Sequence, residues 1–343
     1  MTTEKGNGKD GQVTTQSAQT AGSARTARLK ETLRNILSQR SAQVGLVILA
    51  FLTFTAVFAD VISPYDPLDP LNGPGEPGRR AEPCIHAFYG LPESIGPIPF
   101  LGAWGCPETE METYLGTDNN SRDLFSRIVH GGRLSIPIGP IVVSIAIVIG
   151  MLFGAIGGYV GGMTDNILMR IMDIVLSFPA LILAIAIVTA LRALELKLPD
   201  VMDLVWAVTA VVIVSIPLYA RLTRSAVLTT RENDYVTASR ALGESGAGIL
   251  RRRILPNSIT PLLVAGSLGI ATAVLEVAAL SFLGLGLGEP WAEWGAMIGR
   301  DFNSMFSAPL LVLAPAFMLT LLVLSFNLLG DGLRDALDPR LNR

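Results

Sequence analysis

The chain has 343 residues, of which 50% are hydrophobic and only 16% are charged. Soluble domains usually carry about a quarter charged residues, so this composition argues against a soluble protein and for apolar surface that meets lipid. The formal net charge of −3 is uninformative by itself, and we expect no nucleic-acid partner.

The N-terminal segment divides into two parts. Residues 1–27 are rich in Gly, Ser, Thr, Gln and Ala, which predicts a disordered tail rather than a cleavable signal peptide. Over 28–42, Leu29, Leu33 and Leu37 recur at helical spacing among basic residues. This pattern is typical of an interfacial amphipathic helix that anchors to anionic headgroups, with a gating role as the alternative.

Six apolar stretches are long enough to cross a bilayer, which takes roughly 20 predominantly apolar residues. Each is expected to be helical, because an isolated strand would leave its backbone groups unsatisfied in lipid. The predicted spans are Val44–Ser63, Ile136–Val160, Ile167–Leu191, Leu204–Leu222, a stretch within Ile259–Leu287, and Pro309–Leu329. The sequence therefore predicts an all-α polytopic membrane protein with a first transmembrane segment at 43–63 and the other five spans in a core over 136–343.

The basic residues indicate how these spans are oriented. Lys and Arg gather before the first span and in the loop 221–257, whereas the loop 64–135 has five arginines against ten acidic residues. The positive-inside rule places both basic segments in the cytoplasm and the 64–135 loop outside. With six spans, both chain termini are then cytoplasmic.

The 64–135 loop is rich in Pro and Gly and contains the two cysteines of the chain, Cys84 and Cys106. Two cysteines on the oxidising face indicate a disulfide that closes the loop, and a pair of unrelated thiols is the alternative. A metal site is not expected, because only His86 and His130 could assist the cysteines.

Two patterns in the second and third spans concern helix packing. Four glycines recur at every fourth position: Gly150, Gly154, Gly158 and Gly162. They predict close approach of a neighbouring helix rather than a hinge. Arg170 and Asp173 are three residues apart in the third span, which predicts a structural ion pair rather than a proton relay.

The loop 221–257 contains signals for two short helices outside the bilayer. Asn233 and Asp234 are good N-cap residues, and Gly243 is placed to end the first helix in a left-handed cap. One mildly apolar face of that helix is formed by Tyr235, Ala238, Ser239 and Leu242. A second helical stretch over 246–254 is stopped by Pro256. Together these signals predict a rigid knob suited to a groove on another protein. For any one of them alone, an ordinary amphipathic interhelical loop is the favoured interpretation.

This loop resembles the "EAA" loop of ATP-binding-cassette (ABC) importer permeases, through the run YVTASRALG that ends at Gly243 and the run ILPN that ends at Asn257. Thr237 stands where that motif usually has Glu, and Ser239 where it has its second Ala. The resemblance implies a coupling helix that docks on the ATP-binding subunit. The residues it assigns to coupling are Tyr235, Val236, Thr237, Ala238, Ser239, Arg240, Ala241, Leu242, Gly243, Leu255 and Pro256.

Further motifs, in the same order as in the family, narrow the resemblance to the C-type subunit of the oligopeptide, dipeptide and nickel branch. They are SPYDP from Ser63, LGTD from Leu115, GRLS from Gly132, LSFLGLG from Leu280, FNLLGD from Phe326 and LDPR from Leu337. The resemblance covers roughly residues 40–343, with a loop at about 70–110 that is longer than usual.

The resemblance implies a type I ABC importer permease fold and a non-catalytic transport subunit of the prokaryotic inner membrane. Its implied partners are a second permease subunit, two ATP-binding subunits that carry ATP and Mg²⁺, and an extracytoplasmic solute-binding protein. The chain itself has no phosphate-binding loop, because its one Gly-Lys pair, Gly8-Lys9, is followed by Asp10. An ion-gradient-driven secondary transporter is the main alternative, and a membrane hydrolase or scaffold are others. The solute, a dipeptide, an oligopeptide, a nickel chelate or another, stays open.

Glu276 lies within the fifth predicted span. A carboxylate in lipid is costly, so it should face either the translocation path or a hydrogen-bonding partner at the subunit interface. Both roles stay open.

Overall fold

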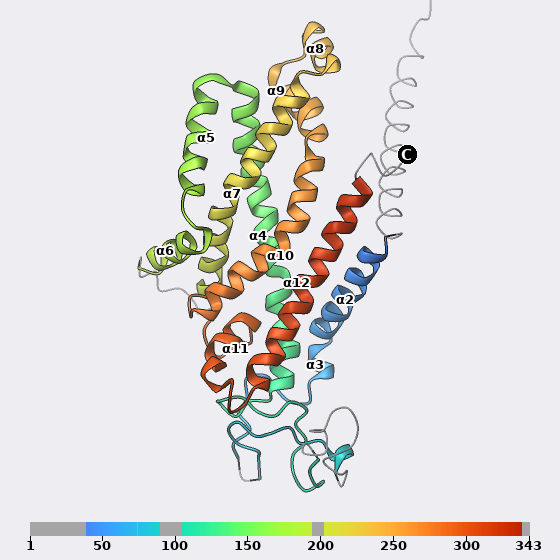
Figure 1. The fold of residues 1–343 in the computed structure, drawn as a ribbon, viewed down its shortest axis with the longest axis vertical. Helices are drawn as coiled ribbons and strands as arrows, with labels where there is room; N and C mark the ends of the chain where they lie inside the picture. Colours follow the sequence, from blue (N-terminus) through green and yellow to red (C-terminus); the bar gives the residue numbers. More distant parts are fainter. Residues whose placement is uncertain (1–38, 74, 90–104, 194–201, 338–343) are drawn as a thin grey trace, which may run out of the picture.

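The computed structural model describes residues 39–73, 75–89, 105–193 and 202–337. The predicted tail at 1–27 and most of the predicted interfacial helix, residues 28–38, lie outside these described residues. The described part is a bundle of long helices, with the segment that follows α3 at one end and α8 and α9 at the other (Figure 1). Apart from isolated bridges, its regular structure is helical, which confirms the all-α prediction.

The longer helices follow in chain order. They are α2 (Arg40–Val57), α4 (Leu124–Val160), α5 (Gly162–Leu176), α6 (Ala180–Arg192), α7 (Met202–Arg231), α10 (Ile259–Phe282) and α12 (Leu310–Leu337). Shorter helices are α3 (Ala59–Ile62), η1 (His86–Phe88), α8 (Asp234–Ala241), α9 (Gly246–Ile249), η3 (Leu250–Ile254), η4 (Leu255–Asn257), α11 (Trp294–Asp301) and η5 (Phe302–Ser304).

The described helices agree with six membrane spans, one of them broken. Five helices are long and apolar enough to cross a bilayer, and α5 with α6 forms a sixth candidate that is bent by 94°. The prediction of a continuous third span was wrong at this bend. Pro179 stands immediately before α6, and a proline disfavours helical geometry in the residue before it, so α5 ends at Leu176.

Two predicted spans are longer than expected because their helices continue beyond the apolar stretch. α4 begins at Leu124 rather than at Ile136, so the end of the predicted 64–135 loop is helical. Asp123 caps this helix by accepting a 2.7 Å hydrogen bond from the backbone N–H of Ser126. Similarly, α7 continues to Arg231, so the predicted 221–257 loop begins as helix.

The first span is interrupted near its outer end, where α2 stops at Val57 and α3 follows after Phe58. Asp60 of α3 then accepts hydrogen bonds from Arg133 and from the ring of His130, both on α4. The interruption therefore turns a carboxylate towards two basic side chains of the neighbouring helix.

Three of the four glycines predicted to mark close packing form the contact between α4 and α7, the most extensive helix contact described. A Cβ on Gly150 would lie 2.7 Å from the Cβ of Tyr219, and one on Gly154 would overlap the carbonyl oxygen of Ala220. Gly158 approaches Val227 in the same way. The prediction was wrong for Gly162, which begins α5 with a φ of +58° and has open space around it.

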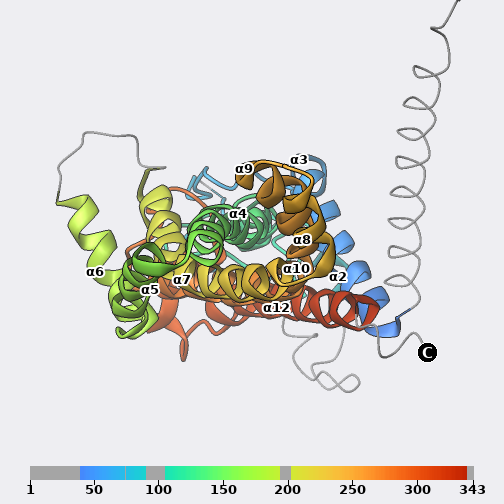
Figure 2. The same ribbon diagram turned by 90° about the horizontal axis from the view of Figure 1, so that it is seen from above.

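The bundle has a compact centre and one peripheral arm, which is formed by α5 and α6. α4, α7, α10 and α12 form the centre, and α2 packs against α12 on one side. α5 and α6 lie on the opposite side from α2 (Figure 2). The arm has little buried surface: in α5 only Asp165 and Met172 are buried.

The segment between α3 and α4 is stabilised by hydrogen bonds and by a cross-link. Cys84 and Cys106 form a disulfide with a Cα–Cα distance of 5.3 Å. The backbones of Cys84 and Thr113 exchange hydrogen bonds of 2.8 and 2.9 Å. His86 brings a ring nitrogen near both sulfurs, but the sulfurs bond each other and are not free thiolates.

Candidate functional site

The tip formed by α8 and α9 lies at one end of the bundle and projects beyond the long helices (Figure 1). α8 follows Asn233, whose side-chain amide donates a hydrogen bond to the carbonyl of Thr230 instead of capping α8. Gly243 has a φ of +81°, which confirms the predicted left-handed end of this helix. The N–H groups of Gly243 and Glu244 donate to the carbonyls of Arg240 and Ser239 there.

The second helical stretch of the tip also forms where predicted. Ser245 caps α9 by accepting from the N–H of Gly248 at 3.3 Å, and Pro256 lies in the last short helix. Val236 of α8 and Ile249 of α9 are buried in one apolar cluster with Val227 of α7. The tip is therefore packed onto the bundle and not loosely tethered to it.

The outer face of α8 is mostly apolar or small. Tyr235 is 41% exposed and Leu242 is 88% exposed, and Ala238 is exposed as well. Ser239 was predicted to share this face but is buried. It lies beside Val236 on the side that packs against the bundle, because positions three apart fall on one side of a helix.

A small polar pocket adjoins α8 on the bundle side. It has a volume of about 280 Å³ and is lined by Tyr159, Arg231, Glu232, Thr237 and Arg240. Arg231 donates to the carbonyl of Gly158 and pairs with Glu232. Within the described residues the guanidinium of Arg240 has no partner. Thr237 stands where the family motif has Glu. It therefore lines this pocket together with the arginine side chains.

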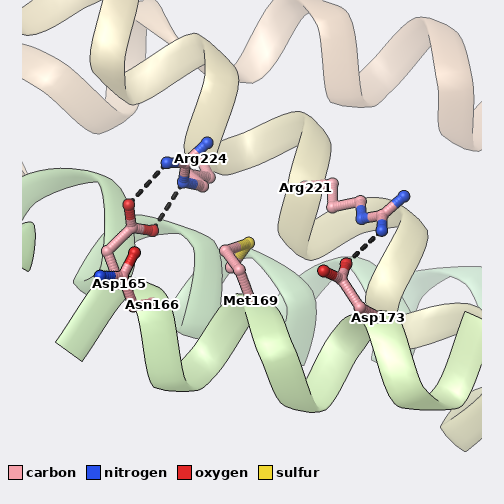
Figure 3. Close-up of a pocket in the computed structure, with 6 residues that line it drawn as sticks. All are labelled: Asp165, Asn166, Met169, Asp173, Arg221 and Arg224. Carbon is pink, nitrogen blue, oxygen red and sulfur yellow. Dashed lines mark hydrogen bonds and ion pairs between the residues drawn. The ribbon is translucent and has the colours of Figure 1, made fainter. Parts of the chain in front are cut away.

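A second polar pocket lies between α5 and α7 (Figure 3). It has a volume of about 310 Å³ and is lined by Asp165, Asn166, Met169, Asp173, Arg221 and Arg224. Arg224 donates two hydrogen bonds of 2.6 Å to Asp165, and Arg221 donates one to Asp173. The predicted pair of Arg170 with Asp173 was wrong. Asp173 points across to α7, which brings its carboxylate to Arg221 instead.

Glu276 of α10 is half-buried. Its carboxylate makes no hydrogen bond or ion pair with any residue that the structure describes. A role in the translocation path and a hydrogen bond to a partner subunit both stay predictions.

A buried network near the start of α4 was not predicted from the sequence. Arg127 is fully buried and donates hydrogen bonds to the carbonyls of Pro67, Pro290 and Trp291 at 2.9, 3.1 and 3.2 Å. Its Nε lies 3.4 Å from a carboxylate oxygen of buried Asp118. The sequence signal for this site is a run of charged residues directly before an apolar stretch, within the predicted 64–135 loop.

Glu289 joins the same network from the segment between α10 and α11. Its carboxylate receives hydrogen bonds from Asn120, Arg122 and Arg300. Four residues on, Glu293 is buried and caps α11 by accepting from the N–H groups of Gly295 and Ala296. Burial raises the pKa of Glu293, and these two backbone hydrogen bonds oppose that rise.

Comparison with known proteins gives two family matches and several relatives. Residues 146–343 match the family "binding-protein-dependent transport system inner membrane component", and residues 28–74 match the "N-terminal TM domain of oligopeptide transport permease C". A dipeptide transport system permease protein of Alkalihalophilus pseudofirmus is 42% identical over 67% of this chain and 73% of that protein. A di/tripeptide permease protein of Pseudomonas aeruginosa is 44% identical over 66% of this chain and 72% of its own length.

A glutathione transport system permease protein of Pectobacterium atrosepticum is 41% identical over 66% of this chain and 73% of that protein. Among solved structures, an inward-facing MetNI methionine ABC transporter aligns with a TM-score of 0.49 at 20% identity, covering 63% of this chain and 98% of that one. The family model spans more than half of the chain, and the sequence relatives are covered over more than two thirds of their length. The chain therefore belongs to the family of inner membrane components of binding-protein-dependent transport systems.

Proposed function

We propose that this chain is a permease subunit of an ABC importer and forms part of the translocation path for di- or oligopeptides or solutes of similar size. Membership of the transport family supports the permease role. The relatives named for dipeptide, di/tripeptide and glutathione transport support a small peptide as the solute. The observation that carries the coupling to ATP is the packed tip at α8, which presents an exposed face with no covering residue in the described chain.

The proposed coupling element is the tip over 235–256, with the exposed side chains of Tyr235, Ala238 and Leu242 at its centre. A coupling element has to be rigid to transmit a movement of the ATPase subunits to the membrane helices. Burial of Val236 and Ile249 against α7 makes the tip rigid. A ligand or partner can shift an equilibrium only through differential contacts, so the docked tip would be the place where ATPase closure acts on the bundle.

The proposed partners are a second permease subunit, two ATP-binding subunits and an extracytoplasmic solute-binding protein. ATP and Mg²⁺ would bind on the ATPase subunits, and this chain would be non-catalytic. The tip together with its flanking residues, 231–257, has five arginines against three acidic residues, which favours an acidic docking surface on the ATPase.

The proposed orientation places α8, α9 and both termini in the cytoplasm and the segment after α3 outside. The bias of Lys and Arg supports this arrangement. The disulfide supports it too, because Cys84 and Cys106 would then meet an oxidising compartment.

The coupling role is tested by Ala238→Trp and Gly243→Trp in the assembled transporter, reconstituted in liposomes with its binding protein. Both positions are exposed, so a large side chain at Ala238 should leave folding intact while preventing the tip from seating. At Gly243, whose φ is +81°, Trp would in addition strain the left-handed end of α8, so recovery of the assembled complex is checked for that variant. We expect docking of the tip to weaken at least about tenfold, which corresponds to about 1.4 kcal/mol, and peptide uptake to fall with it. Ala87→Trp, at an exposed position between the two cysteines, is the matched control and should retain peptide uptake. Fully coupled transport in Gly243→Trp would contradict the assignment.

A further inference from the structure

The pocket between α5 and α7 places charged groups beside an uncharged part of the bundle. From Leu134 to Val160, α4 has no Asp, Glu, Lys, Arg or His. The backbone of Ala220, next to Arg221, packs against Gly150 and Gly154 within that stretch. Gly154 lies six residues before the end of α4 at Val160, which is about 9 Å along the helix. Arg221 and its partner Asp173 therefore lie at the level of the uncharged stretch of α4, which is the part of that helix suited to meet lipid.

The two ion pairs of this pocket differ in exposure. In the Asp165–Arg224 pair the side chains are 11% and 35% exposed, and two parallel hydrogen bonds connect them. In the Asp173–Arg221 pair they are 47% and 50% exposed, and one hydrogen bond connects them. The first pair fixes the start of α5 to α7, whereas the second lies further along α5 and is the more exposed of the two (Figure 3).

Contact with lipid is unfavourable for the more exposed pair, Asp173–Arg221. Charged side chains at bilayer depth face a water-filled cavity or other protein, because each costs several kcal/mol when it meets hydrocarbon. The pocket also has free volume beside the pair, about 310 Å³, with Asn166 and Met169 completing its wall. A cavity of this size holds several water molecules, since each occupies about 30 Å³ in the liquid.

We propose that the pocket between α5 and α7 is a section of the translocation path, and that Asp173 and Arg221 bind the charged ends of a zwitterionic peptide as it passes. The proposal rests on the proposed function as a peptide permease. Asp173 would accept the α-ammonium group and Arg221 would donate to the α-carboxylate, so one internal ion pair is exchanged for two pairs with the peptide.

Exchange of ion-pair partners by Asp173 and Arg221 fits a translocation path better than binding by a single charged side chain would. The pair is neutral overall, and it re-forms when the peptide leaves, so neither the empty nor the occupied state has an uncompensated charge. Conduction requires a site that is favourable enough to enter and weak enough to leave. The less exposed Asp165–Arg224 pair keeps α5 in place while the Asp173–Arg221 pair changes partners.

The test uses the fact that the only two cysteines of the chain form a disulfide, so Met169→Cys introduces one free thiol into the pocket wall. The probe is a charged, membrane-impermeant methanethiosulfonate reagent, applied to the detergent-solubilised full transporter without binding protein, which bypasses selection by that protein. Val47→Cys is the matched control, on the outward side of α2, where Val47 is 68% exposed. We expect Met169→Cys to react much faster than Val47→Cys.

Dialanine and its N-acetylated, C-amidated analogue then separate charge recognition from simple filling of the pocket. We expect dialanine to slow the labelling of Met169→Cys by about tenfold when it nearly saturates the site, and the blocked analogue to have no effect. Adding Asp173→Asn to Met169→Cys should remove the protection by dialanine. The conservative change keeps the shape of the side chain, and normal recovery of the complex shows that the variant has folded.

The outcomes are distinct. Absence of labelling at Met169→Cys, equal protection by both compounds, or protection that survives Asp173→Asn would overturn this proposal while ATP-driven uptake by the unmodified transporter could still stand. Absence of ATP-driven peptide uptake by the unmodified transporter would instead overturn the proposed function itself.

Discussion

Arg127 fixes three separate stretches of chain at the start of α4. Arg127→Ala would leave the carbonyls of Pro67 and Trp291 without this donor and that of Pro290 with only Arg122. It would also remove one cation from buried Asp118, which Arg122 also neutralises. We expect a loss of about 3 kcal/mol of stability, in the range for breaking a buried ion pair. Thermal unfolding of the detergent-solubilised chain measures it.

The control for this prediction is Arg133→Ala. Arg133 pairs with Asp60 and donates to the carbonyls of Ala56 and Val57. Its side chain and that of Asp60 are 39% and 72% exposed, so water can replace these hydrogen bonds and its removal should cost less than about 1 kcal/mol. Equal losses in the two variants would show that the buried network does not stabilise this end of the molecule.

Glu293 gives the molecule a predictable pH dependence. Burial raises its pKa, so between the unfolded value of about 4.3 and the raised folded value the folded state holds more protons than the unfolded state. Stability should therefore fall as pH rises through that window. Glu293→Gln cannot titrate and should lose this part of the slope when melting temperature is followed from pH 4 to 8. An unchanged slope would mean that another group is responsible.

At the scale of elements, the sequence predicts which segments are helical more readily than it predicts the residues at which each helix begins and ends. Apolar length found every described span, because lipid requires it. The ends were missed where polar residues continue a helix outside the apolar stretch, as at Leu124 and Arg231. The break before Pro179 was missed because proline is often tolerated in membrane helices, and only the surrounding packing decides whether the helix bends.

The contact between α4 and α7 gives a test at this scale. Gly154→Ala would place a Cβ against the carbonyl oxygen of Ala220, in backbone that cannot move aside cheaply. We expect a cost of about 1–3 kcal/mol, as for other overpacked sites. Gly288→Ala is the control, since a Cβ there meets nothing within 4 Å. Melting temperatures that agree between the two variants would contradict the assigned packing.

The candidate site shows the same division between local and long-range information. The left-handed end at Gly243 was predictable, because the signals lie within a few residues. The partner of Asp173 was not, because Arg221 is 48 residues away in the chain and only the packing of α5 on α7 brings them together. Similarly, nothing in the sequence near Ser239 distinguished the packed side of α8 from its exposed side.

At the scale of the whole molecule, the tip at α8 and the polar pocket are connected by one helix, α7. The tip at α8 is packed onto α7, and α7 also carries Arg221 and Arg224 of the polar pocket. A displacement of the tip would therefore reach the pocket through one continuous helix, Met202–Arg231, with Pro217 within it. This connection is the structural basis for the proposal that ATPase closure changes access to the path.

ATP-driven uptake tests the central claim most directly. The chain is reconstituted in liposomes with its second permease subunit, the ATP-binding subunits and the binding protein, and uptake of a radiolabelled dipeptide is measured. The account predicts uptake that requires both ATP and the binding protein and that is lost in Ala238→Trp. Uptake by this chain alone, driven by a proton or sodium gradient without ATP, would contradict it.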